Sequence, residues 1–99
     1  MKLLDRIHLQ KYIYLMDQFL NDTIGAELFD TIFIQLRRED NYWMSGSFDY
    51  LTQKILDTYF LDIDEYTPVH LFEKNDSYNI DEEELKRRTR EVYKKLTDG

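Results

Sequence analysis

Residues 59–68, Tyr-Phe-Leu-Asp-Ile-Asp-Glu-Tyr-Thr-Pro, and residues 79–85, Asn-Ile-Asp-Glu-Glu-Glu-Leu, frame the stretch around which the chain is organised. Helical patterns enter and leave this stretch, so we expect an acidic hinge between two helices. Its carboxylates are opposed in the sequence by Lys74 and, when protonated, by His70. A solvated helix face would carry more counter-charges at helical spacing, so we interpret the stretch as a functional surface.

The strongest helix signal of the chain follows directly. Asp81 is suited to cap a helix N-terminus, and Glu84 stands three residues later, as in a capping box. The acids between them favour the positive end of the helix dipole, and cations crowd the later turns, where they are also favourable. We predict a helix over residues 81–97, whose inward residues are Leu85, Thr89, Val92 and Leu96.

Three further helical patterns precede the acidic stretch. They cover residues 3–21, residues 26–40 and a third segment that runs from a cap at Ser45 or Ser47 to about residue 61. Their expected inward residues are Leu9, Tyr12, Ile13, Met16, Phe19, Leu20, Leu28, Phe29, Ile32, Phe33, Leu36, Phe48, Leu51, Ile55, Thr58 and Tyr59. We expect Trp43, in the connector, to plug one end of the core. The fold class predicted is all-α, as a small antiparallel four-helix bundle in a single domain over residues 1–99.

Charge is distributed unevenly along the 99 residues, whose net charge is −7. Residues 47–84 carry eleven acidic and two basic side chains, and the remainder carries nine acidic and eleven basic ones. Such a region repels nucleic acid and membrane surfaces and attracts a basic partner. There is no cysteine, no apolar run long enough for a membrane span and no signal-peptide pattern at the start, so we expect a cytoplasmic protein.

Motifs for catalysis or bound ions are weak. His8 and His70 have no serine or cysteine arrangement around them, and the three glycines are scattered singly, unlike a phosphate-binding loop. Acids match positions 1, 3 and 12 of a calcium loop that would begin at Asp62, but Tyr-Thr-Pro at positions 5 to 7 lacks an oxygen ligand and the turn glycine. We therefore expect no enzyme activity, no metal and no cofactor.

What remains is a carboxylate surface that contains aromatic residues. Its charges are spaced on the scale of a nucleic-acid strand, about one per 3.4 Å, so a protein that grips phosphates can grip them as well. Tyrosine adds contact area of the kind favoured at binding hot spots. An inhibitor of a nuclease needs such a surface. Two other hypotheses stay open, an acidic nucleic-acid mimic directed at a host DNA- or RNA-binding protein and a helical adaptor or dimerisation module.

The order of these motifs resembles a known family. Residues 11–20, Lys-Tyr-Ile-Tyr-Leu-Met-Asp-Gln-Phe-Leu, and residues 25–30, Gly-Ala-Glu-Leu-Phe-Asp, precede the two acidic segments quoted above. This arrangement is similar to the colicin D type of bacterial immunity protein, including relatives that protect against contact-dependent growth-inhibition toxins. The resemblance covers residues 9–96 and is most specific in residues 60–68 and 80–85.

The resemblance implies a small four-helix protein that binds the C-terminal nuclease domain of its cognate toxin. Toxins of this type cleave tRNA in the anticodon loop, and the immunity protein covers their basic tRNA-binding cleft with carboxylates. The second acidic group, residues 81–84, matches the family more loosely than the first, and Asp81 is alternatively only a helix cap. The loop of residues 69–79 departs from the family. The toxin-binding residues predicted are Asp62, Asp64, Glu65, Tyr66, Asp76, Tyr78, Asp81, Glu82, Glu83 and Glu84.

Overall fold

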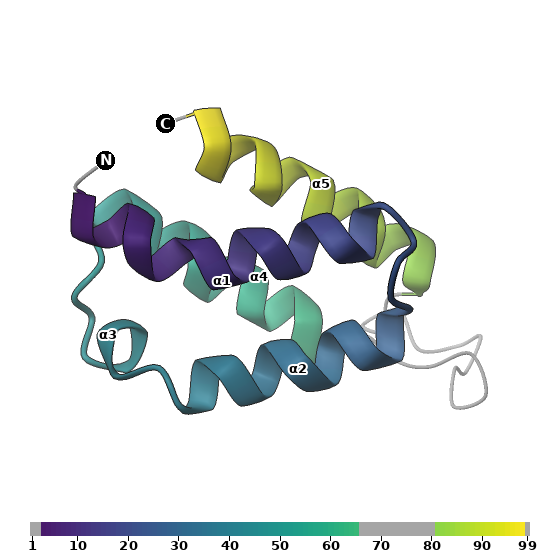
Figure 1. Cartoon of the computed structure of the whole chain (residues 1–99), viewed down its shortest axis with the longest axis horizontal. Coiled ribbons are helices and arrows are strands. Elements are labelled where there is room, and N and C mark those ends of the chain that lie inside the picture. Colours follow the sequence, from purple (N-terminus) through teal and green to yellow (C-terminus); the bar gives the residue numbers. More distant parts are fainter. Residues whose placement is uncertain (1–2, 66–80, 99) are drawn as a thin grey trace.

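The computed structural model describes residues 3–65 and 81–98, and these form five α-helices (Figure 1). Their bounds are α1 Leu3–Leu20, α2 Ala26–Arg38, α3 Asn41–Met44, α4 Tyr50–Glu65 and α5 Glu82–Asp98. Neither described range contains a strand, so the all-α prediction is confirmed. The one-turn helix α3 lies in the expected connector. The finer prediction of an antiparallel four-helix bundle stays a prediction.

Helix α1 lies among the other long helices. In Figure 1 it is in front, with α5 above it, α2 below it and α4 behind it. It packs against α5 and α2, while α4 packs against α5 and α3 packs against α2. Between α1 and α2 the chain turns at Asp22, whose φ of 61° lies in the left-handed region that a short polar side chain tolerates.

Aspartates cap both α3 and α4, although a serine cap was predicted for the helix that corresponds to α4. Asp40 Oδ1 accepts hydrogen bonds from two backbone N–H groups of α3, at 3.0 and 3.3 Å. Asp49 Oδ1 accepts the N–H of Thr52 at 2.9 Å, at the start of α4. The prediction that Ser45 or Ser47 caps this helix is therefore wrong. Their hydroxyl oxygens lie 2.7 Å from each other instead, and α4 begins later than expected.

Aromatic rings form the core shared by α1, α2, α3 and α4. Phe19 stacks on Phe29 with ring centroids 4.4 Å apart, and Phe33 meets Tyr59 edge to face at 5.4 Å. Trp43 is 1% exposed and lies 5.8 Å from Phe33. Ring pairs of this kind contribute about 0.5–1.5 kcal/mol beyond the area that they bury. The expectation that Trp43 plugs the end of the core is confirmed.

The predicted inward faces are right for one helix and rotated for another. All four inward residues predicted for α5 are buried. On α4, Leu51 is 69% exposed and Thr58 is exposed, and the buried residues are Thr52, Leu56, Tyr59 and Ile63. Counting helical periods from Phe48, which lies before the helix begins, rotates the stripe by one residue, about 100°. On α2, Leu28 is likewise exposed rather than inward.

Two buried carboxylates attach α1 to the segment that contains α3. Asp5 accepts hydrogen bonds from the Tyr42 hydroxyl at 2.5 Å and from the Asp49 N–H at 3.1 Å. Asp40 accepts one from the Tyr12 hydroxyl at 2.6 Å. Burial alone would raise the pKa of Asp40, but hydrogen bonds from Tyr12 and nearby donors outweigh it and lower that pKa. These bonds fix the start of α4 relative to α1.

Candidate functional site

The first half of the predicted acidic hinge is helical. Helix α4 continues to Glu65 instead of ending near residue 61, so Asp62 and Asp64 lie in its last turns. The prediction of a hinge is therefore wrong for residues 59–65, where buried Tyr59 and Ile63 extend the helical stripe. Carboxylates near a helix C-terminus are disfavoured by the helix dipole. Local helix stability therefore does not account for the acids at this position.

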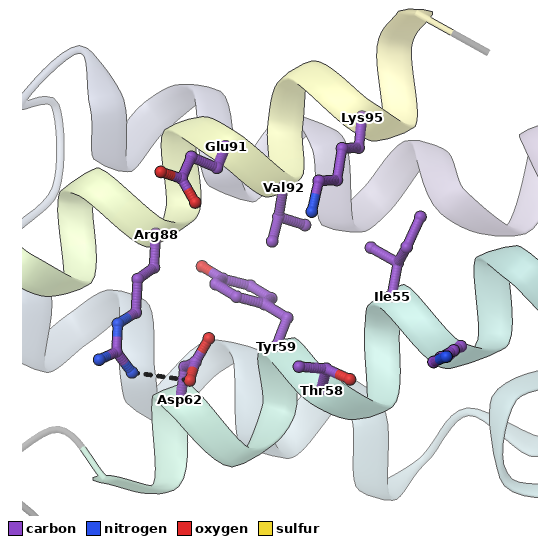
Figure 2. Close-up of a pocket in the computed structure, with 9 residues that line it drawn as sticks. Ile55, Thr58, Tyr59, Asp62, Arg88, Glu91, Val92 and Lys95 are labelled. Carbon is purple, nitrogen blue, oxygen red and sulfur yellow. Dashed lines mark hydrogen bonds and ion pairs between the residues drawn. The ribbon is translucent and has the colours of Figure 1, made fainter.

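Arg88 of α5 brings carboxylates of two helices together (Figure 2). Its Nη1 lies 2.8 Å from Asp62 Oδ1 on α4, and its Nε lies 2.9 Å from Glu84 Oε1 on α5. The expectation that the acidic stretch almost lacks counter-charges is wrong, because α5 supplies them. Asp62 and Glu84 are thus held in defined positions, and part of their charge is neutralised within the protein.

Glu84 also pairs with Arg87, three residues later on the same helix. Arg87 Nη2 lies 2.5 Å from Glu84 Oε1, and Arg87 Nε lies 3.0 Å from Oε2. Hydrogen bonds from Arg87 and Arg88 lower the pKa of Glu84 to about 2, because they stabilise the ionised form. The carboxylate therefore keeps its charge, and its place between two guanidinium groups, across the physiological pH range.

Asp64 is exposed, and its charge acts on a carboxyl group of α2. Burial raises the pKa of Asp30 to about 6, and the negative charge of Asp64 adds to this effect. Asp30 Oδ1 is buried without a hydrogen-bond partner among the described residues. Asp30 was not among the residues predicted for the site. The available signal was its helical spacing from Ala26 and Phe33, both buried, which turns it toward the interior.

The acids at the start of α5 were predicted either to bind the toxin or, for Asp81, only to cap the helix. Asp81 Oδ1 accepts the N–H of Glu84 at 2.9 Å, so the predicted N-cap is confirmed. The side chains of residues 81–83 are all exposed, and they lie at the positive end of the helix dipole. An ion pair between Lys86 and Asp22 attaches this end of α5 to the turn between α1 and α2.

Part of the predicted site lies outside the described residues. Tyr66, Asp76 and Tyr78 belong to that part, as does the loop of residues 69–79. Glu65 is described as the last residue of α4. The role of these residues in binding stays a prediction.

A groove of about 300 Å³ lies between α4 and α5, next to the Arg88 ion pairs (Figure 2). Asp62 and Arg88 line one end of it, and Lys95 lines the other. The ring of Tyr59 lies between these ends, and its hydroxyl lies 2.5 Å from Thr89 Oγ1. Burial raises the pKa of Tyr59, so the hydroxyl stays protonated. The groove therefore joins a charged end to a partly apolar floor.

Other kinds of site find little support in the described residues. No three His, Asp or Glu side chains lie together there as ligands of a metal ion would. His8 stacks on Tyr42, with ring centroids 3.8 Å apart, which is a packing role. None of the helices described is both long and apolar enough to cross a membrane.

These features define a small helical protein in which Arg88 joins acidic residues of α4 and α5, and Asp64 of α4 acts electrostatically on Asp30 of α2. The chain belongs to the family of bacterial self-protective colicin-like immunity proteins, whose sequence model matches residues 7–96. Proteins of this family bind a cognate toxin and are generally not enzymes. The family indicated by the sequence motifs is thus confirmed. No curated protein and no solved structure matches the chain.

Proposed function

We propose that this immunity protein inhibits a nuclease toxin, specifically a tRNase, by covering the basic cleft that would otherwise hold RNA. The observation that carries the proposal is the convergence of carboxylates from separate helices. Arg88 joins Asp62 of α4 to Glu84 of α5, and Asp64 extends the surface toward Asp30 of α2. The proposal includes an antiparallel four-helix arrangement, a cytoplasmic location and a toxin of the colicin or contact-dependent growth-inhibition type.

Inhibition of this kind needs no chemical step by the immunity protein. The carboxylates would take the place of phosphates, which carry about one charge per 3.4 Å of a nucleic-acid strand. The net charge of −7 accelerates association with a basic toxin. Asp62 and Glu84 are already paired with Arg88 within the protein, so their charges are partly neutralised and their side chains are held in place. We therefore assign the main electrostatic contact to Asp64, with Asp30 beside it.

The same surface is electrostatically unfavourable in the free protein. Asp64 lies near the negative end of the α4 dipole, and its charge opposes ionisation of Asp30. A lysine or arginine of the toxin placed between these two carboxylates would relieve both effects. Part of the binding free energy would then come from relief of the electrostatic repulsion present in the free protein. This supports a role of the surface in binding a cation-rich partner.

The substitution Asp64→Lys tests this proposal. We expect the affinity for the cognate toxin domain, measured by calorimetry or surface plasmon resonance, to fall about a hundredfold or more. Protection of tRNA from cleavage should fall in parallel. The melting temperature should be unchanged or higher, because the substitution removes the repulsion of Asp30 and places a cation near a helix C-terminus.

Glu39→Lys is the matched control. Glu39 is exposed and lies at the C-terminal cap of α2, about 13 Å along that helix from Asp30. It changes the net charge by the same amount, so it reports the loss of long-range attraction alone. If both variants lose the same affinity, the end of α4 makes no specific contact and the proposal fails.

A further inference from the structure

The groove between α4 and α5 contains two lysines that have no ion-pair partner among residues 3–65 and 81–98. Lys54 and Lys95 line it from opposite helices and are exposed. Figure 2 shows the Lys95 side chain extending from α5 toward α4. Neither ammonium group forms an ion pair within the described part of the chain. Two lysines that line one groove without an ion pair to any described residue are unexpected in a protein whose net charge is −7.

The acids closest to these lysines in helical spacing are bound to other groups. Glu91 stands one turn before Lys95, but its Oε1 lies 2.7 Å from Arg87 Nη1. Asp57 stands three residues after Lys54, but its Oδ1 accepts hydrogen bonds from the Trp43 indole N–H at 2.8 Å and from a glutamine amide. The intrahelical ion pairs that usually neutralise such lysines are therefore replaced by other contacts.

The floor of the groove between these charges is apolar. Ile55 of α4 and Val92 of α5 line it, together with the ring of Tyr59. At the opposite end, Asp62 and Arg88 neutralise each other. Lys54 and Asp62 are eight residues apart on α4, a distance of about 12 Å along the helix. The groove thus presents an open positive end, an apolar middle and, at the other end, the ion pair of Asp62 with Arg88.

We propose that this groove is a second contact for the toxin and receives an acidic side chain of it, carried on a segment with an apolar face. The inference rests on the proposed function and deepens it. The matching toxin segment carries a cation that meets Asp64 and, about 15 Å away along α4, a carboxylate that enters between Lys54 and Lys95. A uniformly basic nuclease would meet repulsion at the lysines. The groove therefore selects among toxins as well as binding one.

The test compares two adjacent lysines of α5. Lys94 is exposed and lies outside the groove, so Lys95→Glu and Lys94→Glu change the net charge and the helix end equally. The probe is the purified nuclease domain of the cognate toxin. We expect Lys95→Glu to weaken binding at least about tenfold more than Lys94→Glu, mainly through faster dissociation. In binding, Lys54→Glu should behave like Lys95→Glu. The thermal unfolding of Lys95→Glu should agree with that of Lys94→Glu, because both replace a cation in the last turns of α5.

The outcomes separate this inference from the proposed function. Equal affinities of Lys95→Glu and Lys94→Glu, with a large loss for Asp64→Lys, would overturn the groove contact and leave nuclease occlusion standing. A loss for Lys95→Glu with none for Asp64→Lys would support the groove and overturn the acidic contact. In addition, replacing each exposed acid of the toxin by lysine should yield one variant that restores binding to Lys95→Glu. Absence of any such variant counts against the groove contact.

Discussion

Asp30 belongs to the proposed binding surface, but its ionised carboxylate destabilises the fold. Burial, with the charge of Asp64 adding to it, raises its pKa to about 6 from a value of 3.8 in the unfolded chain. The folded state therefore binds this proton more tightly. The associated stability is present below about pH 4 and is lost as the pH rises through 6. Above pH 6 we expect Asp30→Asn to stabilise the protein by about 1–2 kcal/mol, allowing for solvent screening of a half-exposed group.

Urea unfolding of Asp30→Asn and the natural protein over a range of pH tests this prediction. The two free energies of unfolding should agree below about pH 4, separate as the pH rises from 4 to 6, and differ by a constant amount above that range. Asp64→Asn is the control for the neighbouring charge. It should lower the pKa of Asp30 and move the loss of stability to lower pH. A difference that is the same at every pH would show that the carboxyl of Asp30 titrates normally.

Among the helices, α4 and α5 are joined by a buried pair of hydroxyl groups. Thr89 Oγ1 donates to the Leu85 carbonyl oxygen at 2.7 Å, so the Tyr59 hydroxyl donates to Thr89. Thr89→Val keeps the shape of the side chain and leaves the buried Tyr59 hydroxyl without an acceptor. We expect the free energy of unfolding to fall by about 1–3 kcal/mol, measured by chemical denaturation.

Thr97→Val is the matched control for this change. Thr97 makes the same bond to the carbonyl oxygen four residues earlier, at 2.8 Å, but its side chain is exposed. Its replacement should change stability by less than about 0.5 kcal/mol. Equal losses in the two variants would mean that the contact between Tyr59 and Thr89 adds nothing to the packing of α4 on α5.

The contrast between α5 and α4 shows what the sequence determines at the level of helices. The cap at Asp81, the charges that follow it and the inward seam of α5 are all encoded within one segment, so each was predicted correctly. The cap of α4 is Asp49, which also donates its N–H to Asp5, a residue far away in the sequence. The sequence pattern near Asp49 does not indicate its contact with Asp5. Local patterns therefore misplaced the start of α4 and rotated its buried face.

For the molecule as a whole, the net charge of −7 predicts how the complex responds to salt. Added salt screens the attraction between the acidic surface and a basic toxin, with a Debye length of about 10 Å at 0.1 M. The association rate constant should therefore fall by about tenfold or more from low to high ionic strength, with a much smaller change in the dissociation rate constant. Stopped-flow mixing of the two proteins measures both. A salt-independent association rate would argue against electrostatic steering.

The acidic surface was predictable from the sequence in composition but only partly in geometry. The excess of carboxylates between residues 47 and 84 is visible in the sequence. The pairing of Arg88 with Asp62, and the proximity of Asp30 to Asp64, depend on how α2, α4 and α5 pack. Periodicity within a helix does not determine which helices become neighbours. The assignment of Asp62 and Asp64 to the toxin-binding site stays a prediction. The sequence analysis did not include Arg88, which pairs with Asp62, or Asp30, on which the charge of Asp64 acts.

The position of Trp43 gives the protein a built-in optical probe. It is the sole tryptophan of the chain, and its ring lies 5.2 Å from Tyr12 of α1, 5.8 Å from Phe33 of α2 and 6.4 Å from Phe60 of α4. Its fluorescence emission therefore shifts when the contacts of these three helices loosen. Circular dichroism at far-ultraviolet wavelengths also records α5. Denaturation curves from the two signals coincide if all the helices melt together, and separate if α5 detaches first.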